Sequence, residues 1–154
     1  MSGRLSRTLR IIAVGCLLAA TGCGSDSGGH DHDQDHVHVA PRGGRLIELG
    51  NHDGNLEILL EADTGRVRMF VLGAHAEYPV RLTEERIQLT LTQPKALDVE
   101  LVAVASELTG ETVGDTSAFE AVVPELVGEK ALAGKLGAIV YKGRTFRDTS
   151  IEFP

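Results

Sequence analysis

Apolar and polar residues alternate in short runs from Gly44 to the end of the chain. The alternation is clearest in RVRMFV at 66–71, where every second residue is Val or Met. A period of two is typical of a β-strand with one face buried. The runs are RLIELG (45–50), NLEILLEA (55–62), RVRMFVLG (66–73), ERIQLTLTQ (85–93), ALDVELVAV (96–104), SAFEAVV (117–123), KLGAIVYKG (135–143) and RTFRDTSIEF (144–153).

Turn-forming residues separate these runs, among them Asp53-Gly54, DTG at 63–65, Pro79 and Pro94. Short strands at intervals of about 8–12 residues indicate an all-β sandwich or barrel. We therefore predict an all-β fold, a single antiparallel β-sandwich (Ig-like or related) of about seven or eight strands over residues 44–154. Only PELVGEKAL at 124–132 suggests a helix, limited to one turn that begins at Pro124.

The first 22 residues read as an export signal. Three arginines and no acid precede the ten-residue apolar run IIAVGCLLAA, and small residues follow it. The run is shorter than the roughly 20 residues that a membrane span needs. The ending AATGC resembles the lipobox of bacterial lipoproteins, in which a cysteine is acylated and becomes the first mature residue. Cys23 occupies that position, although the family more often has Leu where this chain has Ala20.

Two alternatives remain open, an ordinary cleaved signal that leaves Cys23 as a free thiol, and acylation at Cys16. With Cys23 acylated, the mature domain has no thiol and no disulfide. Acyl chains contribute about 0.8 kcal/mol per buried CH₂, so they would hold the protein on a membrane. We expect a periplasm-facing anchor in the bacterial cell envelope, and the Gly24-Ser25 pair slightly favours the outer membrane.

Composition narrows the class of partner. Removal of residues 1–22 takes away three arginines and no acid, so 12 Lys and Arg face 22 Asp and Glu, a net charge of −10. That charge argues against binding to nucleic acid or to anionic lipid headgroups. The chain has no Trp and few aromatic residues, so its core must be aliphatic.

Residues 23–43 are predicted to be a flexible, disordered N-terminal tether that carries two His-x-His pairs. Imidazole and carboxylate groups are ligands for Zn²⁺, Cu²⁺, Ni²⁺ and Co²⁺, and a flexible ligand set binds weakly. A solvated acidic spacer is the alternative interpretation. The predicted ligands are His30, His32, His36 and His38, with Asp31, Asp33 and Asp35.

His52, His75 and Glu77 form a second candidate set, in the loops at 51–54 and 73–79. Consecutive antiparallel strands alternate in direction, so these two loops should share one end of the sheet. The N-terminal arm should enter at the opposite end, although its length would let it fold back. The alternative is that both histidines are ordinary exposed loop residues.

Catalytic motifs are absent from the sequence: there is no G-x-S-x-G, H-E-x-x-H, C-x-x-C or phosphate-binding loop. Asp115 and Glu120 lie close in sequence, but acids are too abundant here for the pair to indicate catalysis. We expect a protein that is not an enzyme.

Three strings, HVHVAPRGGRLIELGNHDGNLEILLEADTG, FVLGAHAEYPVRL and LTGETVGDTSAFE, resemble small exported bacterial proteins associated with heavy-metal efflux systems, some of them lipoproteins. The resemblance covers roughly residues 36–154. It implies a role in metal homeostasis of the envelope, with a metal-efflux complex as partner, and it extends to His36, His38, His52 and His75. The pattern often has His where this chain has Arg42, so one ligand is missing there.

Together these observations predict an envelope lipoprotein that weakly binds a divalent transition metal, Zn or Cu(II) above others, and supports metal tolerance or efflux. The alternative is a non-catalytic interaction module on a lipid-anchored tether, with no metal role.

Overall fold

The computed structural model describes residues 38–153. The predicted signal peptide, Cys23 and the arm residues up to His36 lie outside the described residues, so those predictions are not addressed by the fold. Between residues 38 and 153, no helix has the length and apolar character needed to cross a membrane.

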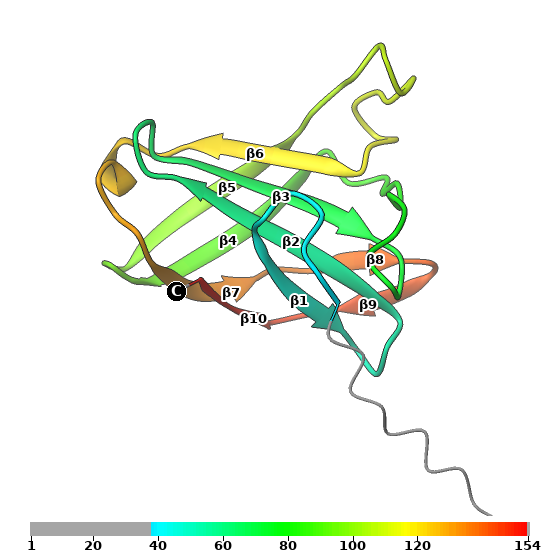
Figure 1. Cartoon of the computed structure of the whole chain (residues 1–154), viewed down its shortest axis with the longest axis horizontal. Helices are drawn as coiled ribbons and strands as arrows, with labels where there is room; N and C mark the ends of the chain where they lie inside the picture. Colours follow the sequence, from blue (N-terminus) through cyan, green and yellow to red (C-terminus); the bar gives the residue numbers. More distant parts are fainter. Residues whose placement is uncertain (1–37, 154) are drawn as a thin grey trace, which may run out of the picture. The chain divides into compact units, whose positions relative to one another are not determined.

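The described chain is almost entirely β-structure (Figure 1). Its only helical element is η1, a single 3₁₀ turn at Pro124–Leu126 with Pro at its start, as the sequence predicted. The strands are β1 (Arg45–Leu49), β2 (Gly54–Glu61), β3 (Arg66–Leu72), β4 (Arg86–Gln93), β5 (Leu97–Ala103), β6 (Ala118–Val122), β7 (Leu132–Leu136), β8 (Ile139–Tyr141), β9 (Arg144–Phe146) and β10 (Thr149–Phe153).

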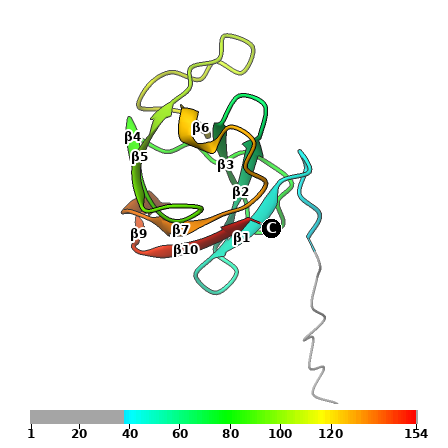
Figure 2. The same cartoon turned by 90° about the vertical axis from the view of Figure 1, so that its left-hand side faces the viewer.

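Eight strands form one antiparallel sheet in the order β1-β2-β3-β6-β5-β4-β7-β10. The all-β antiparallel prediction is confirmed. The predicted two-sheet sandwich is not confirmed, because hydrogen bonds connect these eight strands in one continuous sheet. Strands β5 and β6 pair through only two residue pairs, Val102 with Glu120 and Ala103 with Phe119. The sheet curls so that its end strands, β1 and β10, come into contact (Figure 2).

The inward face of this curled sheet is the hydrophobic core. Alternation along β4 buries Ile87, Leu89 and Leu91 and exposes the residues between them. The other strands contribute further aliphatic side chains, with Phe119 and Tyr141 among the largest fully buried residues. The core is therefore mainly aliphatic, as the composition predicted.

The first six alternating runs each form one strand, but each of the last two runs contains two. β7 pairs with β10, and β8 pairs with β9 in a separate two-stranded sheet. The breaks fall at Gly137-Ala138 and at Asp148, which has a positive φ of 52°. The chain from 132 to 153 is thus a bent hairpin, and its tip, β8–β9, leaves the main sheet.

Candidate metal centre

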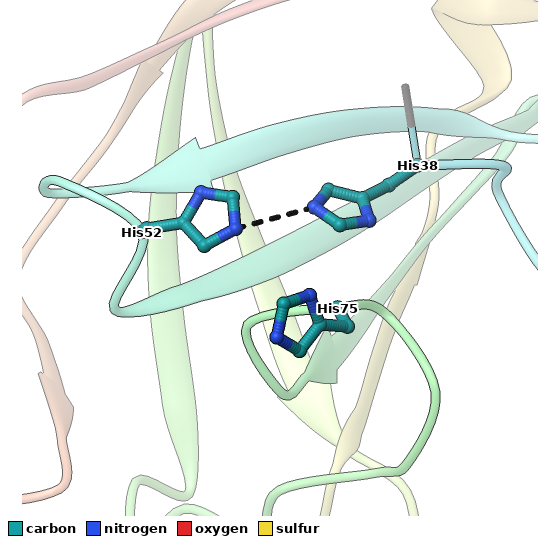
Figure 3. A group of neighbouring side chains, drawn as sticks. All are labelled: His38, His52 and His75. Carbon is teal, nitrogen blue, oxygen red and sulfur yellow. Dashed lines mark hydrogen bonds between the residues drawn. The ribbon is translucent and has the colours of Figure 1, made fainter. Parts of the chain in front are cut away.

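Three histidines from separate segments meet at one end of the sheet (Figure 3). His38 precedes β1, His52 lies in the β1–β2 turn, and His75 lies in the loop after β3. Their ring centroids are 5.2–5.5 Å apart, and one ligand nitrogen from each ring lies within 4.8 Å of the others. His52 and His75 are exposed and His38 is half-buried, so an ion can reach the group from solvent.

The spacing suits a tetrahedral ion. A Zn–N bond is about 2.0–2.1 Å long, which places two tetrahedral nitrogen ligands roughly 3.4 Å apart. The Nε2 atoms of His38 and His52 are 3.4 Å apart. The ligand nitrogen of His75 lies within 4.8 Å of the other two and would have to move closer for all three rings to share one ion. Three imidazoles around a tetrahedral ion leave one coordination position for water or for a ligand from another molecule.

The tight turn between β1 and β2 positions His52. Gly50 has a φ of 63°, and a Cβ there would lie 2.3 Å from the Asp53 carboxylate, so the turn needs glycine at that position. His52 itself has a φ of 65°, a conformation that costs a non-glycine residue roughly 1–2 kcal/mol. Its backbone N–H donates to Glu48 Oε1, which is also 3.5 Å from its Nδ1. The Nε2 atom, on the other side of the ring, faces Nε2 of His38 and is the nitrogen that a shared metal would use.

The loop that carries His75 is attached to the start of β2. Asn55 is buried, and its side-chain amide donates to Gly73 O at 3.2 Å and to Ala74 O at 2.7 Å. The loop is closed by a backbone hydrogen bond from Gly73 N to Tyr78 O. Since Asn55 lies three residues after His52, the same short stretch of chain positions two of the three histidines.

The β8–β9 hairpin supports both loops from the side. Arg144 donates from one guanidinium nitrogen to both carboxylate oxygens of Asp53, in the His52 turn. Tyr141 is buried and donates through its hydroxyl group to Leu72 O, just before the His75 loop. The two loops are therefore fixed by contacts that do not involve a metal.

His38 reaches the group because the chain before β1 folds back. Glu57 lies on the outer face of β2 with none of its side chain exposed, because residues 42–44 cover it. It accepts hydrogen bonds from Arg42 N (2.7 Å), Arg42 Nη1 (3.1 Å) and Gly44 N (3.1 Å), and the Arg42 guanidinium stacks 3.9 Å from the Phe70 ring centroid. The chain enters β1 at Arg45, at the end of the strand opposite the β1–β2 turn, as predicted. Residues 38–44 fold back from there toward the turn, the path that the length of the arm allowed.

The structure brings together candidates from both predicted sets. His38 joins His52 and His75, whereas Glu77 is exposed and does not belong to the group of potential ligands. His30, His32, His36 and the three arm aspartates lie outside the described residues. Arg42, where a further ligand was missing, instead pairs with Glu57.

Sequence reasoning missed the residues that position the histidines, namely Glu48, Asn55 and Glu57. Glu57 had the strongest signal, since it interrupts the apolar positions of NLEILL. Alternation alone predicted an exposed side chain there. Its burial depends on a segment that returns over the sheet, which the pattern does not encode.

Asp115 and Glu120, which lie close together in the sequence, each form ion pairs with nearby arginines. Asp115 pairs with Arg81 at 2.8 Å, and Glu120 lies within 4 Å of Arg66 and Arg68. Neither acid belongs to a cluster of potential metal ligands in the described part of the chain.

No protein-family profile, curated protein or solved structure matches this chain.

Proposed function

We propose that this protein binds a divalent transition metal through His38, His52 and His75. The observation that supports the proposal is the convergence of three imidazoles from three separate segments. Two of these segments are held by contacts independent of any metal: Asn55 fixes the His75 loop, and Arg144 fixes the His52 turn.

The ligand set favours borderline ions. Three neutral imidazoles suit Zn²⁺, Cu²⁺, Ni²⁺ or Co²⁺, whereas Mg²⁺ and Ca²⁺ prefer oxygen ligands and Cu(I) prefers sulfur. The one methionine of the predicted mature chain, Met69, is fully buried in β3. An exposed site with three protein ligands suits binding and release of an ion more than permanent structural retention.

We place this activity in the bacterial cell envelope. The AATGC sequence supports acylation at Cys23, and the 23–43 tether would then connect the membrane to the domain. His30, His32 and His36 add three imidazoles immediately before the centre and would raise the local concentration of metal there. This arrangement fits a non-catalytic carrier or buffer that supports metal homeostasis or an efflux complex.

Titration calorimetry of the full chain with Zn²⁺, Cu²⁺ and Ni²⁺ tests the proposal. One variant replaces His52 and His75 by Ala, and a matched variant replaces His30 and His32 by Ala. We expect the first pair of substitutions to weaken binding at least tenfold and the second pair to leave most of the affinity. Glu77→Gln is the control for a change of charge beside His75.

Equal losses in the two double variants would show that the arm and the centre contribute alike. Binding that depends only on the arm would contradict a centre at the end of the sheet. No binding by the wild-type chain below millimolar metal would favour the interaction module.

A further inference from the structure

The contacts of Glu57 with residues 42–44 hold the segment that carries His38, the third histidine of the group. His52 and His75 stay in place through the β2 and β8–β9 contacts, but His38 lies on a segment held by different bonds. The only long-range side-chain hydrogen bonds of residues 39–44 go to Glu57, and Arg42 adds its stacking on Phe70.

Close backbone packing gives the segment a defined path. A Cβ at Gly44 would lie 2.4 Å from Ile58 O, so the chain crosses β2 in direct contact with it. Gly43, with a φ of 77°, forms a turn that is closed by a hydrogen bond from its N–H to Ala40 O. His38 lies beside the other two rings, and the path of the chain that carries it is set four residues after the ligand, at Arg42.

We propose that Glu57 and Arg42 are the positioning residues of the centre and decide whether the ion is held by three imidazoles or by two. This inference rests on the proposed function. Binding free energies are reciprocal, so metal at the three histidines must also stabilise the docked form of residues 38–44. If the chain is anchored through Cys23, metal binding would then fix where the tether leaves the domain.

The test uses the full chain with His30, His32 and His36 replaced by Ala, titrated with Zn²⁺. Arg42→Ala and Glu57→Gln should each weaken binding by about 10–100-fold, the range for residues that orient metal ligands. Arg42→Lys keeps the charge and should recover part of the affinity. The control is Glu61→Gln, on the same face of β2, whose carboxylate pairs with the half-exposed Arg66 and Arg68.

A double-mutant cycle separates positioning from general destabilisation. Once His38 is Ala, Arg42→Ala should cause little further loss of affinity, because there is no third ligand to position. Limited digestion with trypsin gives the reciprocal measurement. Zn²⁺ should slow cleavage after Arg42 in the parent chain, and it should have no such effect in the His52→Ala variant.

A parent chain that binds Zn²⁺, loses affinity in His38→Ala and keeps it in both Arg42→Ala and Glu57→Gln would overturn this inference while leaving the proposed function intact. A parent chain that does not bind Zn²⁺ would overturn both. If Glu57→Gln fails to fold, Arg42→Ala decides, because this side chain is partly exposed and its loss leaves the core intact.

Discussion

Two buried glutamates organise two different regions of the molecule in the same chemical way. Glu57, on β2, accepts hydrogen bonds from Arg42 and Gly44. Glu111, in the loop between β5 and β6, accepts hydrogen bonds from Ser117 N, Ser117 Oγ and Thr109 Oγ1, and Arg81 lies 3.9 Å away. Each carboxylate therefore has two or more hydrogen-bond donors and an arginine.

The regions differ in what the carboxylate joins. The donors to Glu111 come from two and six residues away, so it stabilises its own loop, which also contains the fully exposed Leu108. The donors to Glu57 come from 13 and 15 residues away, and they bring His38 to two other histidines. The same kind of contact serves stability alone in one region and also assembles a candidate site in the other.

Glu57→Gln should have the largest effect on stability. The amide keeps the shape but loses the charge that holds Arg42 and two backbone N–H groups, and hydrogen bonds to charged groups contribute about 1.5–3 kcal/mol each. We expect the free energy of unfolding to fall by about 2 kcal/mol in urea denaturation, together with the loss of Zn²⁺ affinity. Glu61→Gln should change it by less than about 0.5 kcal/mol. Equal effects of the two substitutions would remove the special role of Glu57.

Glu111→Gln should lower stability and leave metal affinity unchanged. Burial raises the pKa of Glu111, but hydrogen bonds from Ser117 and Thr109 and the charge of Arg81 outweigh it and hold that pKa below its ordinary value. A carboxyl with a lowered folded pKa stabilises the fold above the pKa of unfolded glutamate, about 4.3, and this contribution is lost as pH falls through the folded value.

Thermal unfolding from pH 7 to pH 3 measures this difference. We expect a gap of roughly 1–2 kcal/mol between wild type and Glu111→Gln at pH 7, which narrows below pH 4. Glu107→Gln, at an exposed position of the same loop, should show no such gap. A loss of Zn²⁺ affinity in Glu111→Gln would contradict the division between the two regions.

Much of the fold follows from local pattern. Period-two alternation with intervening turn residues located each of the first six strands, and the alternation of strand direction predicted that His52 and His75 share an end. The β7–β8 and β9–β10 boundaries were missed because backbone bends at Gly137-Ala138 and Asp148 divide runs whose alternation is otherwise continuous.

The candidate site was less predictable than the fold. His38 was assigned to the arm because nothing in the local sequence says that residues 42–44 cover Glu57. That contact depends on residues 13–15 positions apart and on the outer face of β2, where alternation predicts exposure. Asn55 posed the same difficulty, since its two acceptors are backbone carbonyls of the His75 loop, 18 and 19 residues away.

Glu48→Gln should weaken Zn²⁺ binding about tenfold and leave stability nearly unchanged. The Glu48 carboxylate accepts a hydrogen bond from the His52 backbone N–H and lies 3.5 Å from Nδ1 of the ring, so it restrains the orientation of His52, and outer-sphere groups of this kind change affinity 10–100-fold. The side chain is about half exposed, so its contribution to folding is small. Calorimetry beside the Glu77→Gln control measures the effect, and identical affinities would mean that Glu48 does not orient the ring.

His52→Gly should change stability only slightly, and it separates metal binding from folding at a single position. At a φ of 65°, His52 pays a steric cost that glycine does not, while glycine loses more backbone entropy on folding, by about 0.5–1 kcal/mol. We therefore expect the glycine variant to be at least as stable as wild type and about 0.5–1 kcal/mol more stable than His52→Ala, in which the strain remains.

Asp148→Gly, at a φ of 52°, is the matched control: it relieves a similar strain but removes no imidazole. Urea denaturation should show a similar shift for both glycine variants, whereas Zn²⁺ titration should show reduced affinity only for His52→Gly. If His52 costs stability relative to glycine but increases metal affinity, it behaves as a metal ligand. An unchanged affinity in His52→Gly would instead leave this ring as an ordinary turn residue.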